Sequence, residues 1–169
     1  MQRGRFITFE GGEGAGKTTQ ARLLVERLRA RGLDVLQTRE PGGSPGAEEI
    51  RNIAVSGEAD RWSARTETLL MYAARSDHLE RTILPALEAG RWVGCDRFAD
   101  SSRVYQGAGG GTPESLIEAL DDAVVNGDQP DLTLVFDLPV KVGLDRAFGR
   151  GLFETRFESK GLAFHQKLR

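Results

Sequence analysis

Short apolar runs alternate along this chain with longer segments in which apolar residues recur every three or four positions. An apolar run of roughly four to eight residues predicts a buried strand, whereas the longer periodicity predicts a helix with one buried face. The predicted strands are residues 5–10, 34–38, 91–96 and 132–137. The predicted helices are residues 17–31, 47–55, 63–89, 113–124 and 139–146, with another helix from residue 157 onward.

Glycine and proline residues mark the ends of these elements. Gly32 is expected to stop the first helix, Pro85 to bend or divide the long third one, and residues 39–46, rich in both types, to form a loop. Strands that alternate with helices predict an α/β fold, with a parallel sheet covered by helices on both faces. Ligands of such folds bind at the carboxyl ends of the strands, where the loops after residues 10, 38 and 96 are expected to gather.

The loop after the first strand matches the phosphate-loop pattern G-x-x-x-x-G-K-[ST]. Its residues are Gly11, Gly12, Glu13, Gly14, Ala15, Gly16, Lys17 and Thr18, followed by Thr19. Glycines let backbone N–H groups surround phosphate oxygens, Lys17 neutralises their charge, and the Thr18 hydroxyl is a ligand for Mg²⁺. Because a strand precedes the motif and a helix follows it, we predict a nucleoside triphosphate site rather than an ordinary glycine-rich turn.

Composition narrows the classes of partner. With 169 residues, 39% of them hydrophobic, the chain is expected to form one domain with a single core. A net charge of −2 gives no overall attraction to nucleic acid or to an anionic membrane. The single Cys95 cannot form an internal disulfide, and neither a signal pattern nor a membrane-length apolar run is present, so a cytoplasmic location is expected. His78 and His165 suggest no metal cluster.

Four segments together resemble the thymidylate kinase family, in order and over nearly the whole chain. They are residues 10–19 (EGGEGAGKTT), 38–43 (TREPGG), 72–75 (YAAR) and 96–107, which begins with DRF and ends with YQG. The resemblance implies a three-layer P-loop nucleoside monophosphate kinase fold made by residues 1–169. It also implies the reaction of ATP and dTMP to ADP and dTDP in nucleotide biosynthesis, with Mg²⁺, in a cytosolic homodimer.

The resemblance assigns roles around the transferred phosphate. Glu13 would point toward the acceptor sugar and accept a hydrogen bond from its 3′-hydroxyl, because an acid facing the triphosphate would be repelled. Arg39 and Arg97 would contact the acceptor phosphate, and Asp96, with Thr18, would help to position Mg²⁺. Asp96 and Arg97 directly follow a predicted strand, which independently favours their placement at the ligand edge.

Further positions are expected to contact the base and the sugar of dTMP. Arg75 resembles the family arginine that binds a thymine carbonyl. Met71, with Tyr72 beside it, stands where the family commonly stacks an aromatic ring on the base, and a thioether can also cover a base. Ser102 would read the pyrimidine edge and Tyr105 would disfavour a ribose 2′-hydroxyl. The predicted acceptor-binding set is Glu13, Arg39, Met71, Tyr72, Arg75, Arg97, Ser102, Tyr105 and Gln106.

A basic, glycine-containing segment at about residues 147–157 is expected to form a lid. Gly12 stands where another subtype of the family carries an arginine, so the arginine that stabilises the transition state would come from the lid. Arg150 and Arg156 are the candidates, and with Lys17, Asp96 and Arg97 they complete the predicted catalytic set. Family lids often read Asp-Arg-Phe-Glu, whereas this chain has Thr155 before Arg156.

Thymidylate kinases usually continue beyond the point at which this sequence stops, so the C-terminal part of the family fold is expected to be missing. Two alternatives stay open at this point. One is a kinase for another nucleoside monophosphate, which would differ around Arg75, Ser102 and Tyr105. The other is a non-catalytic P-loop nucleotide-binding protein, although the chain lacks the Asn-Lys-x-Asp motif of GTPases.

Overall fold

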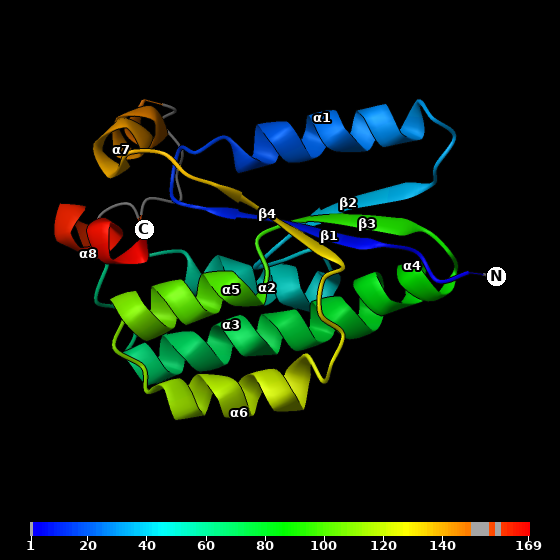
Figure 1. Cartoon of the computed structure of the whole chain (residues 1–169). Coiled ribbons are helices and arrows are strands. Elements are labelled where there is room, and N and C mark those ends of the chain that lie inside the picture. Colours follow the sequence, from blue (N-terminus) through cyan, green and yellow to red (C-terminus); the bar gives the residue numbers. More distant parts are fainter. Residues whose placement is uncertain (1, 150–155, 158–159) are drawn as a thin grey trace.

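The computed structural model describes residues 2–149, 156–157 and 160–169 of the chain. A parallel four-stranded sheet lies at its centre, in the order β2-β3-β1-β4. The strands are β1 (Phe6–Gly11), β2 (Val35–Arg39), β3 (Trp92–Asp96) and β4 (Leu132–Phe136). The predicted α/β fold class is confirmed, and the carboxyl ends of all four strands lie at one edge of the sheet (Figure 1).

Helices lie on both sides of this sheet, with α1 and α7 on one side and α2 to α6 on the other (Figure 1). The α-helices are α1 (Lys17–Arg29), α2 (Pro45–Ala54), α3 (Ala64–His78), α4 (Leu84–Glu88), α5 (Ala99–Ser102), α6 (Glu114–Val124), α7 (Val140–Phe148) and α8 (Leu162–Leu168). Two π-helical segments, η1 (Leu79–Ile83) and η2 (Arg103–Gly109), continue α3 and α5.

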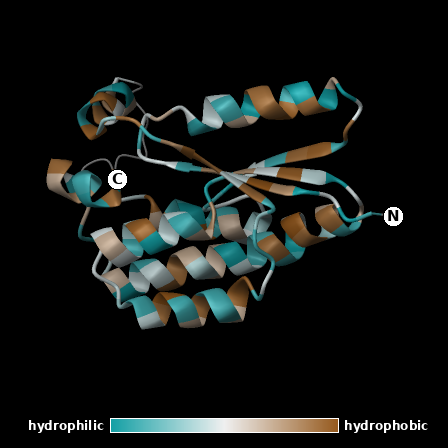
Figure 2. Cartoon of the chain, viewed as in Figure 1, coloured by the Kyte–Doolittle hydropathy of each residue, from teal (hydrophilic) through white to brown (hydrophobic). Residues whose placement is uncertain are grey.

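Alternation along β1 divides the core between the two faces of the sheet. Ile7 and Phe9 share one face of β1, because residues two apart in a strand point to the same side. On that side they pack with Ala21 of α1. Phe6 faces the other way, into a larger cluster with Leu79 of η1, and its ring meets that of Phe98 edge-on at 4.9 Å. Figure 2 shows apolar residues along the strands, which lie between the two layers of helices.

Most predicted elements are confirmed, and the differences have local causes. The helix predicted over residues 63–89 follows one path, but it changes from α to π geometry at Leu79, and Pro85 lies in the first turn of α4, directly after the π-helical segment. A loop was expected after residue 96, and no helix was predicted over residues 99–109, but these residues form α5 and η2 despite Gly107 and Gly109. The last helix begins at Leu162 rather than at residue 157.

The fourth strand also differs from its prediction. Although its sequence is apolar, it lies at the edge of the sheet, and Val135 is 73% exposed.

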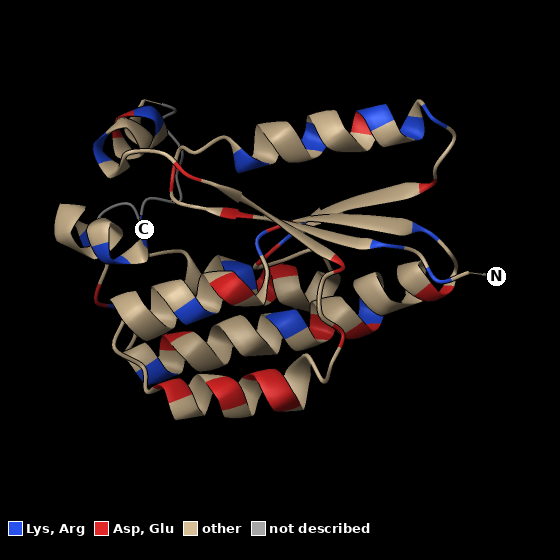
Figure 3. Ribbon diagram, in the orientation of Figure 1, with Lys and Arg blue, Asp and Glu red and all other residues tan. Residues whose placement is uncertain are grey.

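The helices on the two sides of the sheet differ in charge: α1 carries mainly basic residues, whereas the charged residues of α6 are all acidic (Figure 3). In the part of the chain that the structure describes, no helix is long and apolar enough to span a membrane.

Candidate active site

The phosphate loop connects β1 to α1 and ends at Gly16, whose φ of 94° brings the chain into the helix. Lys17 is the first helical residue, and its ammonium donates a hydrogen bond of 2.7 Å to the Gly12 carbonyl oxygen. Burial, together with the nearby charge of Arg97, lowers the pKa of Lys17 to about 8. The free N–H groups of a helix N-terminus and this lysine form a site suited to an anion.

The back of the loop packs closely against α7. Gly14 adopts a φ of +67°, and a Cβ there would overlap the carbonyl oxygen of Gly143. Only glycine meets both demands without strain, because other residues rarely adopt this conformation. Gly14 therefore allows the phosphate loop to pack closely against α7.

Thr18 and Asp96 meet at the front of the loop. The Thr18 hydroxyl donates a hydrogen bond to the Asp96 carboxylate at the end of β3. Hydroxyl and carboxylate oxygens are hard ligands of the kind that Mg²⁺ takes together with phosphate oxygens and waters. Within the described residues no group of three or more His, Cys, Asp or Glu side chains forms a metal site by itself.

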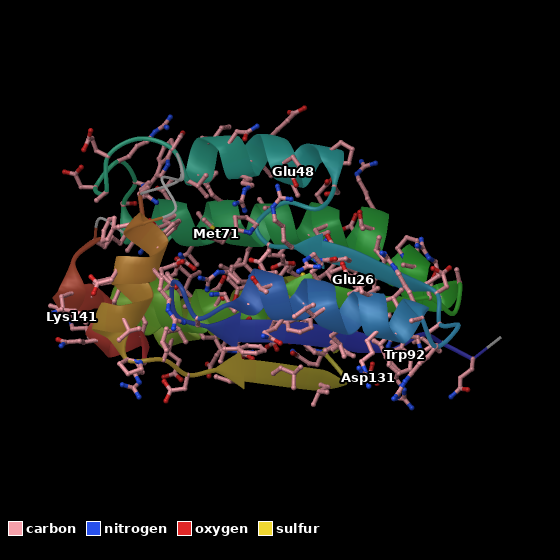
Figure 4. The ribbon with its side chains drawn as sticks, turned by 90° about the horizontal axis from the view of Figure 1, so that it is seen from above. Glu26, Glu48, Met71, Trp92, Asp131 and Lys141 are labelled. Carbon is pink, nitrogen blue, oxygen red and sulfur yellow. The ribbon has the colours of Figure 1, made fainter. Side chains whose placement is uncertain are left out.

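A cavity of about 130 Å³ lies beside the loop. Its lining residues are Glu13, Glu40, Pro41, Arg51, Val55, Met71, Arg75, Arg97, Phe98, Ser101, Ser102, Tyr105, Gln106 and Phe157. Seven of the nine predicted acceptor-binding residues are among them: Glu13, Met71, Arg75, Arg97, Ser102, Tyr105 and Gln106. The structure thus brings together side chains from the phosphate loop, from α3 and from the segment after β3; Figure 4 shows Met71 on α3, next to α2, which carries Glu48.

Glu13, Arg97 and Tyr105 form the polar end of this cavity. The Glu13 carboxylate accepts hydrogen bonds from Arg97 (2.9 Å) and from the Tyr105 hydroxyl (2.7 Å), and Arg97 also donates to Tyr105 (3.1 Å). Burial raises the pKa of Glu13, but the charges of Arg97 and Lys17 outweigh it and leave the pKa lowered. Glu13 is therefore an ionised acceptor that faces the cavity.

Arg97 is held in an unusual backbone conformation, with φ at 73°. Its own N–H donates to the Phe9 carbonyl (3.0 Å), while Glu10 accepts hydrogen bonds from the Phe98 N–H (2.7 Å) and the Ser101 hydroxyl (2.6 Å). Burial raises the pKa of Glu10. Strained conformations persist where the surroundings fix them, and they concentrate at functional sites. Sequence reasoning missed Glu10 as a support, although an acid at the end of an apolar run, directly before a phosphate loop, was a usable signal.

Arg75 forms the other polar end and is buried. Its Nε pairs with Glu40 at 2.8 Å, and one terminal nitrogen donates to the Phe98 carbonyl (3.1 Å) and the Ser102 hydroxyl (3.0 Å). The guanidinium lies 4.7 Å above the ring of Tyr72. Nη1 is buried and has no hydrogen-bond partner among the described residues. An orphaned donor of this kind at a cavity wall indicates a place for a ligand acceptor.

Two predicted acceptor residues lie outside the cavity lining. Arg39, at the end of β2, is 51% exposed on its side chain and pairs with Glu48 at 3.0 Å. Tyr72 faces the interior, where its hydroxyl donates to Asp121 (2.8 Å). Tyr72 therefore supports Arg75 from behind in this structure, and the contact of Arg39 with an acceptor phosphate stays a prediction.

The structure describes one of the two predicted lid arginines. Arg150 lies outside the described residues. Arg156 is 2% exposed and bonds Glu67 and three backbone carbonyl groups rather than residues of the phosphate loop. This environment is not the one foreseen for a transition-state arginine, so a catalytic role for Arg156 stays a prediction that its contacts do not support.

Several lining residues were not predicted. Glu40 and Pro41 stand in the TREPGG segment, and Phe98 and Ser101 directly follow Arg97, so their neighbours were the available signal. Arg51 and Val55 come from α2 and the turn after it, where the sequence carries no motif.

Comparisons with known proteins show the family to which the chain belongs. A family model described as thymidylate kinase matches residues 9–169. The chain is 64% identical to a thymidylate kinase of Caulobacter vibrioides over 169 residues, covering 100% of this chain and 81% of the relative. It is 59% identical to one of Ruegeria pomeroyi, covering 98% and 78%. The solved thymidylate kinase of Ehrlichia chaffeensis matches with a TM-score of 0.75 and 39% identity, covering 86% of this chain and 77% of that one. By its family model and its relatives, this chain belongs to the thymidylate kinase family.

Proposed function

We propose that the phosphate loop binds ATP with Mg²⁺ and that the neighbouring cavity holds dTMP with its phosphate toward Arg97. As a member of the thymidylate kinase family the chain is a kinase that uses a nucleotide phosphoryl donor, and it phosphorylates dTMP to dTDP. The proposal adds the identity of the donor and the metal, and the roles of individual residues.

One observation carries the proposal: Glu13 belongs to the phosphate loop and also lines the acceptor cavity, where it is bonded to Arg97. A donor on the loop and an acceptor in the cavity would therefore meet at this point. Phosphoryl transfer requires little covalent help from the protein, so positioning and charge stabilisation provide most of the catalysis. Glu13 and Arg97, which lie between the two sites, would provide this positioning and charge stabilisation.

Each charged group then has a defined task. Lys17 and the loop N–H groups would hold the donor phosphates, and Arg97 would hold the acceptor phosphate after exchanging its bond to Glu13 for one to a phosphate oxygen. Thr18 and Asp96 would hold Mg²⁺, which neutralises charge that develops on the transferred group. Glu13, released from Arg97, would accept a hydrogen bond from the sugar 3′-hydroxyl.

Arg75 would read the base. Its unpartnered Nη1 is a donor, and it fits a carbonyl oxygen such as O4 of thymine but not the amino group found there in cytosine. Met71 would cover the face of the ring. The lid at residues 147–157, the action of Arg150, the single domain, the homodimer and the cytoplasmic location that the resemblance implies stay predictions.

The test is ADP formation with Mg-ATP and each nucleoside monophosphate in turn. We expect turnover mainly with dTMP. Lys17→Ala should lower kcat by a factor of roughly 100 or more while preserving the fold, because it removes a charge that neutralises the transferred phosphates. Lys141→Ala, which changes an exposed lysine of α7, is the matched control and should leave the rate unchanged. Equal turnover of dCMP would refute the role of Arg75, and turnover of no acceptor would refute the proposal.

A further inference from the structure

One buried carboxylate joins three segments that lie far apart in the sequence. Glu67, in the first turn of α3, is 3% exposed. Its carboxylate pairs with Arg156 at 2.6 Å and with Lys160 at 3.1 Å, and it accepts a hydrogen bond from Gln106 of η2 at 2.9 Å. Two cations from the C-terminal segment therefore pair with the same acid of α3.

Arg156 also donates hydrogen bonds to backbone around the connection between α2 and α3, and its guanidinium lies 5.2 Å from the centre of the Phe157 ring. Its guanidinium donates to the carbonyl oxygens of Ala54 (3.2 Å), Glu58 (3.1 Å) and Ala59 (3.2 Å). A guanidinium offers five N–H donors in a rigid fork, and these bonds direct the fork into the protein interior. The geometry is that of an anchor for the chain at this point.

The anchored segment reaches the acceptor cavity through its next residue. Phe157 lines the cavity, and its ring meets the ring of Tyr105 edge-on at 5.8 Å. Phe164 of α8 makes a second edge contact with Tyr105 at 6.1 Å. The Phe157 carbonyl lies 3.0 Å from Nε2 of His165. Tyr105 is therefore held by aromatic rings on its apolar side and by Glu13 and Arg97 at its hydroxyl.

We propose that Glu67 is a positioning residue for the acceptor site: by pairing with Arg156 and Lys160 it holds Phe157 against Tyr105 and completes the cavity wall. In this arrangement Arg156 also acts by position rather than by touching the transferred phosphate. Removing one partner of a buried ion pair is strongly unfavourable. Phe157 should then lose its position against Tyr105. The proposal rests on the proposed function for its effect on catalysis, but not for its structural part.

The structural part is tested by limited trypsin digestion of the full chain, with mass spectrometry to count cleavage after Arg156 and Lys160. Both sites are protected while Glu67 pairs with them, and proteolysis follows the population of the open form. Glu67→Gln should speed cleavage there by about 100-fold or more, since it removes the carboxylate with which both cations pair. Glu118→Gln removes the same charge from an exposed position of α6 and is the control. Unchanged protection in Glu67→Gln overturns the proposal.

Arg156→Lys serves as a second variant if Glu67→Gln fails to fold. It keeps the charge and both trypsin sites but loses the fork that reaches the three carbonyl groups. Cleavage should again accelerate, and native protection would overturn the anchoring role.

Kinetics separate positioning from chemistry. In Glu67→Gln we expect KM for dTMP to rise about tenfold and the preference for dTMP over UMP to fall, because Tyr105 loses its backing. Adding Arg156→Ala to that variant should change the rate by less than about twofold, since both changes break one unit. A large loss of kcat on adding Arg156→Ala would overturn the proposal in favour of a transition-state arginine. If the unmodified chain turns over no acceptor, the proposed function fails, while the trypsin result still decides whether Glu67 is an anchor.

Discussion

Glu40→Ala should destabilise the fold strongly, because Glu40 compensates the charge of Arg75, which is almost fully buried. The side chains of Arg75 and Glu40 are 3% and 4% exposed, and their closest atoms lie 2.8 Å apart. The other Glu40 oxygen lies 3.1 Å from Nδ1 of His78, whose Nε2 lies 2.7 Å from the Thr38 hydroxyl. Burial by itself would lower the pKa of Arg75, but Glu40 outweighs it and the pKa is raised.

The expected size follows from that geometry. Removing one partner of a buried ion pair costs about 3–5 kcal/mol, and Arg75 retains its bonds to Phe98 and Ser102, so we expect about 3 kcal/mol. With a urea dependence of about 2 kcal/mol per molar, the unfolding midpoint should fall by about 1.5 M. Urea titration followed by the fluorescence of Trp62 and Trp92 measures this shift.

Two variants make the reasoning refutable. Glu26→Ala removes the acid of an exposed pair with Arg22 on α1, and it should cost no more than about 0.5 kcal/mol. Arg75→Met combined with Glu40→Ala removes both buried charges, and it should be less destabilising than the sum of the two single changes. If Glu40→Ala costs less than about 1 kcal/mol, or if the two changes simply add, the buried pair does not have the role assigned to it.

Three more predictions concern the loop and the sugar site. Because burial and Arg97 lower the Lys17 pKa to about 8, the unfolded chain holds more protons on Lys17 between pH 8 and its ordinary pKa of 10.5, so this group makes stability rise with pH in that window. Phosphate charge should raise the pKa again, and calorimetry of Mg-ATP binding at pH 8 in buffers of different ionisation enthalpy should show uptake of about half a proton, absent in Lys17→Ala. Gly14→Ala should lower the melting temperature by about 6 °C, since it combines strain with overlap at Gly143, whereas Gly12→Ala, which meets nothing within 4 Å, should not. Tyr105→Ala should reduce the dTMP/UMP ratio of kcat/KM by about tenfold, because the ring proposed to exclude a ribose hydroxyl is lost; an unchanged ratio removes Tyr105 from the sugar site.

The sequence predicted best where the signal was local. The strand, glycine loop and helix around Lys17 follow from residues adjacent in the chain, and the structure contains all three. The segment after Arg97 was harder, because its glycines disfavour helix, yet residues 99–109 form a continuous helical path. Tertiary contacts decide there: Glu10 bonds the Phe98 N–H and the Ser101 hydroxyl at the start of that path.

The surroundings of a side chain could not be predicted where they consist of backbone groups from a distant part of the sequence. The carbonyl groups that receive Arg156 belong to residues about one hundred positions earlier, and a carbonyl oxygen leaves no mark in the sequence. The basic character of the segment suggested a phosphate ligand, and it gave no sign of the pairing of Arg156 with the internal acid Glu67. The same limit applies to Val135, whose type indicates burial but whose strand lies at the edge of the sheet.

The helical periodicity of α3, by contrast, places Glu67 on the same face as two residues of the acceptor cavity. Glu67, Met71 and Arg75 stand four residues apart on α3, and each step of four advances the side chain by about 40°, so all three share one face. Met71 and Arg75 line the acceptor cavity, while Glu67, one turn earlier, holds the segment that supplies Phe157. One face of one helix therefore provides the proposed base-reading donor, the proposed cover of the base and the anchor of the wall. A rotation of α3 would displace all three together, so a change that loosens this helix should weaken base selection and sugar selection in the same variant.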